Sequence, residues 1–80
     1  MDNIFIVSLI ESPIAGYNYD DVYELFYASS HEKCIEFIKQ VLKDAESGIE
    51  DTSILRITKA EIDKYFGEYQ IIDEKRAIDY

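Results

Sequence analysis

The stretch from residue 3 to residue 10 constrains the fold most, because it is apolar on both sides of an extended chain. Alternate residues of a strand point to opposite faces of the sheet. One face would carry Phe5, Val7 and Leu9, and the other Ile4, Ile6 and Ile10. A strand that buries both faces lies inside its sheet. We therefore predict a central strand at 3–10, and other elements or a partner must pack against both of its faces.

A second strand is predicted at 22–28, after a segment of turn-forming residues. Residues 11–21 contain the single proline and one of the three glycines, which predicts a loop. The two faces of the second strand would carry Tyr23, Leu25 and Tyr27 on one side and Val22, Phe26 and Ala28 on the other. Two strands joined by one loop make an antiparallel hairpin the simplest arrangement.

The clearest local signal is for a helix at 31–46. Residues 29–32 match the capping box S-x-x-E, in which Ser29 and Glu32 would each bond the other's free backbone N–H. Apolar residues then recur at helical spacing, with Phe37 at the edge of the stripe. They are Cys34, Ile35, Ile38, Val41, Leu42 and Ala45. Gly48 is placed to end the helix, because glycine readily adopts the left-handed conformation found at helix ends.

The last third predicts two strands and a short helix. Residues 53–58 and 68–73 favour strands. Between them, residues 58–61 form another capping box, followed by apolar residues at helical spacing, so a helix at 59–66 is favoured over an extension of the preceding strand. Residues 74–80 would form a polar tail or a short edge strand.

These elements predict an α+β fold in one small domain, 1–80, in the order β-β-α-β-(α)-β. The helix at about 31–46 would pack on one face of a small antiparallel or mixed sheet. One helix covers one face only. The other face would be covered by the short helix, by a second copy in a homodimer, or by a functional target.

Charge narrows the classes of partner. The chain carries 17 Asp and Glu against 8 Lys and Arg, for a net charge of −9. Residues 1–32 hold six of the acids and no base, so they supply −6 of that total. This acidity argues against direct contact with nucleic acid or an anionic membrane, since phosphate contacts need Lys and Arg. It favours a basic protein partner.

The residue content offers little support for catalysis or metal binding. Cys34 is the single cysteine, so no internal disulfide forms, and with no basic signal segment at the N-terminus a cytoplasmic location is expected. His31 lies three residues before Cys34, but a cysteine on an apolar stripe is typical of a core. One cysteine and one histidine cannot make a zinc pattern. We therefore expect no enzyme activity, no metal and no cofactor.

The segment from residue 17 to residue 24 is the candidate partner-binding site, because it interleaves tyrosines with acids and contains no base. Its candidate residues are Tyr17, Tyr19, Asp20, Asp21, Tyr23 and Glu24. Tyrosine supplies a large, rigid contact area with a polar tip. Carboxylates beside it can pair with Arg or approximate the spacing of phosphates. The alternative is an ordinary hairpin with strand tyrosines.

The leading functional expectation is a non-enzymatic inhibitor that occludes a basic, nucleic-acid-handling protein. Phage anti-defence proteins and DNA mimics share this small, acidic profile, which is an analogy of class and not of motif. One alternative is an immunity protein or antitoxin that neutralises a toxic nuclease. Another is a structural or regulatory homodimer that uses the uncovered sheet face.

Overall fold

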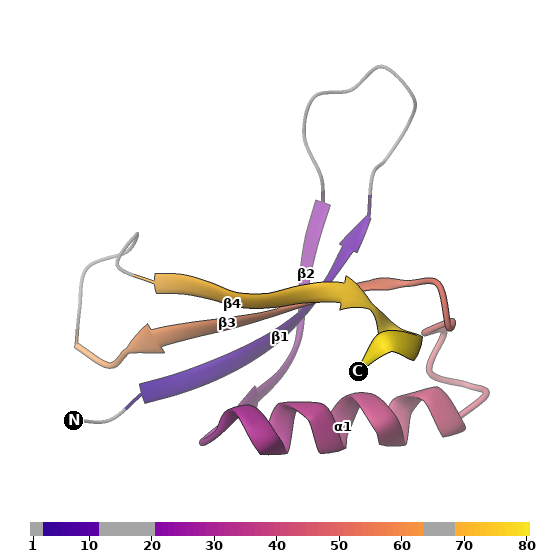
Figure 1. Cartoon of the computed structure of the whole chain (residues 1–80), viewed down its shortest axis with the longest axis horizontal. Helices are drawn as coiled ribbons and strands as arrows, with labels where there is room; N and C mark the ends of the chain where they lie inside the picture. Colours follow the sequence, from indigo (N-terminus) through magenta and orange to yellow (C-terminus); the bar gives the residue numbers. More distant parts are fainter. Residues whose placement is uncertain (1–2, 12–20, 64–68) are drawn as a thin grey trace.

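Four strands of the described residues form one antiparallel sheet in the computed structural model, and an α-helix packs on one face of it (Figure 1). The structure describes residues 3–11, 21–63 and 69–80. The elements are β1 (Asn3–Glu11), β2 (Asp21–Ala28), α1 (His31–Lys43), β3 (Ile54–Glu61), β4 (Tyr69–Arg76) and a 3₁₀ helix, η1 (Ala77–Asp79). The predicted α+β class is confirmed. Over the described residues the order is β-β-α-β-β.

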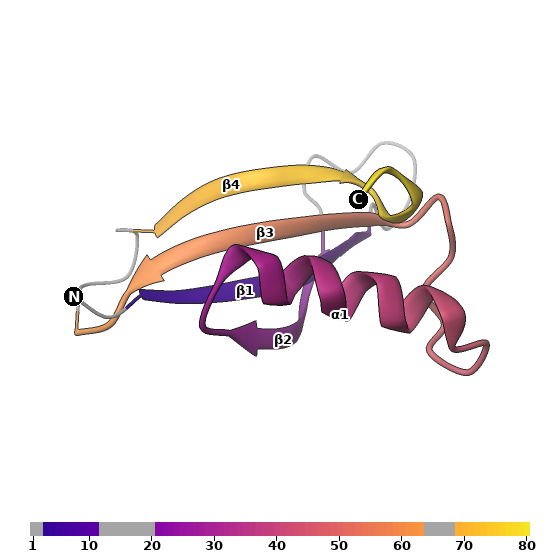
Figure 2. The same ribbon diagram turned by 60° about the horizontal axis from the view of Figure 1, so that its bottom comes forward.

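β1 lies inside the sheet, as its two apolar faces predict. The strand order is β2-β1-β3-β4, and every neighbouring pair is antiparallel. The predicted hairpin of the first two strands is thus confirmed. Because β2 and β3 run in the same direction on either side of β1, the chain crosses over β1 between them. The crossover contains α1, which lies against one face of the sheet (Figure 2).

A β-bulge in β2 changes which of its residues share a face. The register with β1 slips between Val7 and Ser8 and leaves Leu25 without a partner. One extra residue reverses the alternation beyond it. Tyr23 and Tyr27, predicted on one face, therefore lie on opposite faces. The same bulge divides the other predicted set, with Val22 on one face and both Phe26 and Ala28 on the other.

The core lies between the sheet and α1. Its buried residues are Val7, Ala28, Cys34, Ile38, Leu55, Ile57 and Ala77. The central strands β1 and β3 meet the predicted apolar stripe of α1 there. On the β2 side, Phe26 stacks on Phe37 of α1, with ring centroids 4.3 Å apart and planes within 3° of parallel.

The helix starts at His31 as predicted, but its cap and its end differ. Ser30 is the N-cap instead of Ser29: its hydroxyl oxygen accepts a hydrogen bond from the Lys33 backbone N–H at 3.2 Å. α1 ends at Lys43, three residues before the predicted end, because Asp44 has an extended backbone. Within the described ranges, no helix is long and apolar enough to cross a membrane.

The predicted helix at 59–66 is wrong over residues 59–63. β3 continues to Glu61, and residues 59–60 pair with β1 on one side and β4 on the other. Two flanking strands provide hydrogen bonds and packing that outweigh a local capping pattern. Ile62 and Asp63 form a turn, with Asp63 at a φ of 67°. Residues 64–66 lie outside the described residues.

Residues 74–80 extend the sheet and complete the core. Of the two predictions for this segment, the edge strand holds for 74–76, which are part of β4. The polar tail is wrong for 77–80: Ala77 is buried, and its backbone N–H donates to the Ser53 carbonyl at 2.8 Å. The Tyr80 hydroxyl donates to the Leu55 carbonyl at 2.5 Å. The C-terminal residues thus cover one end of the core.

Truncation of Ile38 tests this core. We expect Ile38→Ala to lower the free energy of unfolding by about 3 kcal/mol, because it leaves a cavity between α1 and the sheet. Ile78→Ala makes the same change at a side chain that is 51% exposed, and it should cost about 0.5 kcal/mol or less. Urea unfolding followed by circular dichroism measures both values. Equal losses would contradict a core centred on Ile38.

Candidate protein-binding surfaces

The predicted binding residues do not share one surface where the structure describes them. Tyr17, Tyr19 and Asp20 lie outside the described residues. Asp21, Tyr23 and Glu24 lie on β2, which is an edge strand. Opposite residues of an antiparallel pair point to the same face, so Tyr23, opposite Leu9, faces the α1 side. Glu24, opposite Ser8, points to the other face.

Two acidic residues face each other where β1 ends and β2 begins. Glu11 of β1 is directly opposite Asp21 of β2. Neither side chain makes an ion pair with another residue of the described ranges. Like charges directly opposite in a sheet destabilise it, by up to about 1 kcal/mol. A locally unfavourable arrangement of this kind is expected where function requires it.

No other described element covers the sheet face opposite α1 (Figures 1 and 2). Apolar side chains make up much of this face. We call it the open face. Its apolar residues come from all four strands: Ile4, Ile6, Ile10, Val22, Tyr27, Ile54, Ala60, Tyr69 and Ile71. The four on the edge strands, Val22, Tyr27, Tyr69 and Ile71, are each between 49% and 55% exposed. Exposed apolar surface of this kind is more common at binding sites than elsewhere on soluble proteins, which makes this face a candidate interaction surface.

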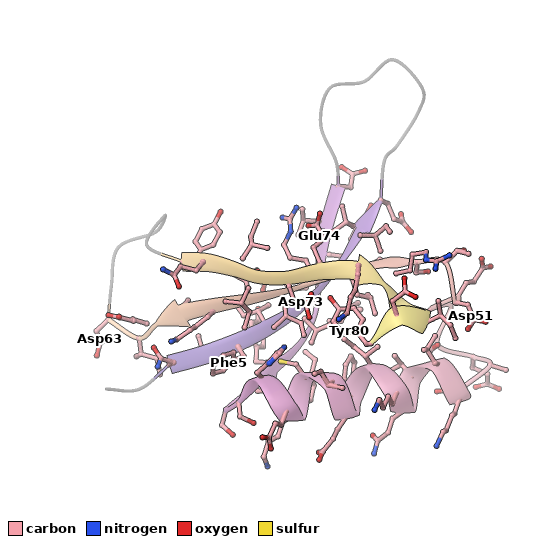
Figure 3. The ribbon with its side chains drawn as sticks, viewed as in Figure 1. Phe5, Asp51, Asp63, Asp73, Glu74 and Tyr80 are labelled. Atoms are coloured by element: carbon pink, nitrogen blue, oxygen red, sulfur yellow. The ribbon has the colours of Figure 1, made fainter. Side chains whose placement is uncertain are left out.

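One polar row crosses the open face. Its four members are cross-strand partners in the order Glu24, Ser8, Arg56 and Glu74. Arg56 Nε donates to Glu74 Oε1 at 2.5 Å, and the Tyr27 hydroxyl donates to the Glu24 carboxylate. Glu74 lies on the side of β4 away from α1, whereas Asp73 lies on the α1 side (Figure 3). The two rows that flank this polar row are largely apolar, with Arg76 at the end of one and Thr58 within the other.

The open face is hollowed where the polar row crosses it. A groove of about 340 Å³ extends from Val22 and Glu24 on β2 to Tyr69 on β4. Ser8 and Thr58 of the central strands line it and are only 3% and 6% exposed. The groove therefore combines apolar walls with hydroxyl and charged groups, which is the usual character of a recognition site.

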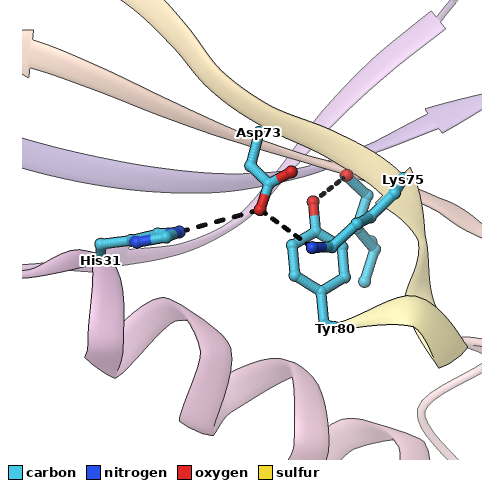
Figure 4. A network of polar contacts seen from close by, with 5 residues as sticks. His31, Asp73, Lys75 and Tyr80 are labelled. Atoms are coloured by element: carbon cyan, nitrogen blue, oxygen red, sulfur yellow. Dashed lines mark hydrogen bonds and ion pairs between the residues drawn. The ribbon is translucent and has the colours of Figure 1, made fainter.

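On the α1 side, a polar group links the helix, β4 and the C-terminal residue (Figure 4). An Asp73 carboxylate oxygen lies 3.9 Å from His31 Nε2 and 3.4 Å from Lys75 Nζ. Lys75 Nζ also lies 4.7 Å from the centre of the Tyr80 ring. Burial, reinforced by the nearby Asp73 carboxylate, raises the pKa of the Tyr80 hydroxyl. These contacts hold the C-terminal segment against β4 and the core.

Cys34 lies in the core and has no exposed surface. Burial raises the pKa of its thiol. The thiolate is the nucleophilic form, so a raised pKa makes the sulfur less reactive. The polar neighbour of His31 is Asp73, not Cys34. Among the described residues, no three His, Cys, Asp or Glu side chains gather closely enough to hold a metal ion.

The β3 and β4 part of the open face was not predicted from the sequence. Arg56, Tyr69 and Ile71 fall in the strands predicted at 53–58 and 68–73, but the order and register that place them together on one face were not predicted. A usable signal exists in residues 55–58, where Leu55 and Ile57 alternate with Arg56 and Thr58. That alternation indicates one strand whose second face is more polar than its first.

Comparison with known proteins gives no match: no family model, no curated protein and no solved structure is significantly similar to the chain. Its function must therefore be inferred from its surfaces.

Burial predicts a slow reaction of Cys34 with thiol reagents. We expect the native protein to react with an aromatic disulfide reagent roughly 100-fold more slowly than the urea-unfolded chain, since the sulfur must first become exposed by local opening. Absorbance of the released aromatic thiol follows the reaction. A native rate equal to the unfolded rate would show that Cys34 is accessible and would contradict its place in the core.

The raised pKa of Tyr80 predicts a loss of stability in alkali. An unfolded tyrosine has a pKa of about 10. Because folding raises the pKa, the contribution of Tyr80 to stability is complete below about pH 10 and is lost as the pH rises toward the folded-state value. Tyr80→Phe should cost about 1 kcal/mol at neutral pH, from the lost hydrogen bond to Leu55. It should also flatten the alkaline decline.

Urea unfolding of the wild type and Tyr80→Phe, measured from about pH 8 to about pH 11, tests this expectation. Tyr69→Phe is the control, because the Tyr69 side chain is 54% exposed. It should leave the alkaline decline unchanged. Parallel curves for the wild type and Tyr80→Phe would show that Tyr80 does not contribute to the decline.

Proposed function

We propose that the chain is a non-enzymatic inhibitor of a basic, nucleic-acid-handling protein. It would act by placing carboxylates on the surface where the partner holds phosphate. The observation that supports this most directly is the acidic pair Glu11 and Asp21, held opposite each other without an ion pair to any described residue.

The position of this pair suits it to guanidinium and ammonium groups. Opposite residues in an antiparallel ladder have Cα atoms about 4.5–5.5 Å apart, so the two carboxylates are close enough to engage one Arg fork or two neighbouring cations. A partner's cations would also relieve the repulsion within the pair. Asp20 precedes Asp21 in the chain and adds a third acid to the segment.

The charge of the surrounding segment favours the same partner class. Residues 1–32 hold no Lys or Arg, so no base of that segment neutralises Glu11 or Asp21. An excess of one sign accelerates encounter with a partner of the opposite sign, and salt weakens that attraction. The proposed location is the reducing cytoplasm, where Cys34 remains a free thiol. An anti-defence inhibitor and an immunity protein would both use this chemistry, and the identity of the partner separates them.

Neutralising the acidic pair tests the proposal. Tagged wild type, Glu11→Gln/Asp21→Asn and the control Glu36→Gln/Glu46→Gln are used to capture proteins from a host lysate at about 50 mM NaCl. The two variants lose the same charge, but the control loses it on α1 and in the loop after it. We expect the wild type and the control to retain one basic nucleic-acid-binding protein, and the pair variant to bind it at least about tenfold more weakly.

Competition then tests the occlusion mechanism with the purified partner. DNA or RNA should displace the chain, because both occupy the partner's phosphate-binding surface, and binding should weaken as salt rises. A complex in which the partner holds nucleic acid and the chain at the same time would refute occlusion. Equal losses in the pair variant and the control would remove Glu11 and Asp21 from the interface.

A further inference from the structure

We propose that the open face is a homodimer interface, in which two copies of the chain pack face to face. This inference uses a different surface from Glu11 and Asp21 and does not depend on a basic partner.

The charge on the open face favours a second copy over a basic protein. Among the described strand residues that the register places on it, two are acids, Glu24 and Glu74, and two are bases, Arg56 and Arg76. These four charges cancel, and Arg76 is also bonded to Asp79 of η1, with its Nε 2.8 Å from the carboxylate. Even with Asp79 counted, these residues carry only −1 of the net charge of −9. A basic partner therefore gains little net attraction there, and a second copy meets little net repulsion at the contact.

The polar row of one molecule can pair with the same row of a second molecule. A two-fold axis between the copies would bring the row of one against the row of the other, since an isologous interface uses the same patch twice. The Arg56 guanidinium uses its Nε–H on Glu74 and has further N–H groups available. The opposing row offers the carboxylates of Glu24 and Glu74. Apolar residues on both sides of the row would exclude water from these pairs.

The size of the open face agrees with a weak but specific dimer. Four strands about 4.8 Å apart and about eight residues long at about 3.3 Å per residue give a projected area of roughly 500 Å². Side-chain relief raises the accessible area above that value. Typical specific interfaces bury about 800 Å² per partner, so the dimer belongs at the small end of the range. We expect a dissociation constant on the order of 10 μM.

Salt should strengthen this dimer, which is the reverse of its effect on a basic partner. Two copies of charge −9 repel each other at long range, and salt screens that repulsion. The apolar contact and the short charge pairs inside it are screened much less. The two proposals thus predict opposite responses to one variable.

Sedimentation velocity from about 1 μM to about 500 μM, at about 50 mM and about 500 mM NaCl, tests the proposal. The mass should rise with concentration from 9.3 kDa toward twice that value, and the dimer fraction should be larger at the higher salt. A mass of 9.3 kDa throughout overturns the proposal, and so does a dimer that salt dissociates.

Matched lysine substitutions locate the interface. Ile71 on the open face and Ile78 in η1 are 52% and 51% exposed, so both tolerate a polar residue without loss of core packing. Ile71→Lys should weaken the dimer at least about tenfold, because the two-fold axis places the new charge in the interface twice. Ile78→Lys should change the dissociation constant less than about twofold. Equal weakening by both variants overturns the proposal.

Val22→Lys is the second variant on the open face, on the other edge strand, and it should also weaken the dimer. Circular dichroism and thermal unfolding of each variant separate loss of dimer from loss of fold. The variant Glu11→Gln/Asp21→Asn should still dimerise, so the homodimer and the basic partner can fail independently. A dimer that Val22→Lys and Ile71→Lys leave intact would lie on another surface and would overturn the proposal.

Discussion

The packing of α1 on β1 and β3 determines what each surface of this protein can do. Ile38 and Cys34 of the helix stripe have no exposed surface, and neither do Val7, Leu55 and Ile57 on the strands beneath them. Burying an aliphatic side chain of this size stabilises a small domain by roughly 1.5–3 kcal/mol. The contact between α1 and the sheet therefore supplies a large part of the free energy of folding. The described residues contain one α-helix, and it covers one face of the sheet. None of the described elements covers the opposite side of this apolar central strand.

The bulges then decide which side chains lie on which side. In β2 the unpaired Leu25 reverses the alternation, so that Phe26 reaches the core and stacks on Phe37. The same reversal sends Tyr27 to the open face, where its hydroxyl donates to Glu24. A second register shift, between Ile57 and Thr58 of β3, leaves Ile72 of β4 without a partner and places Ile71 opposite Thr58, on the open face. A bulge is a backbone event with no reliable signature in side-chain type, and its effect reaches every residue beyond it.

Local sequence patterns predict some parts of this fold, whereas strand pairing and bulges determine the others. Residues 3–10 are apolar on both faces, which specifies a central strand without knowledge of its neighbours, and Cys34 and Ile38 stand out by helical periodicity. The residues at 59–61 carry a helix-capping pattern, and only the pairing of β3 with both β1 and β4 decides against it. Predicting that pairing requires the tertiary structure. The candidate site shares this limit, because the bulge at Leu25 puts Tyr23 and Tyr27 on opposite faces, whereas the simple alternation of a strand predicts one face for both.

The strand register also shows how the net charge of −9 is distributed over the surface. On the open face the strand charges cancel, and the polar row already holds Arg56 against Glu74. Most of the excess negative charge therefore lies elsewhere, and where β1 ends and β2 begins it includes two carboxylates directly opposite each other. Surfaces of such different character favour different partners, because an apolar neutral face gains most from excluded water, whereas an acidic pair gains most from an opposite charge. A dimer formed through the first would carry the second twice, once on each copy, and a partner with two basic sites within reach would then bind by avidity as well as by charge.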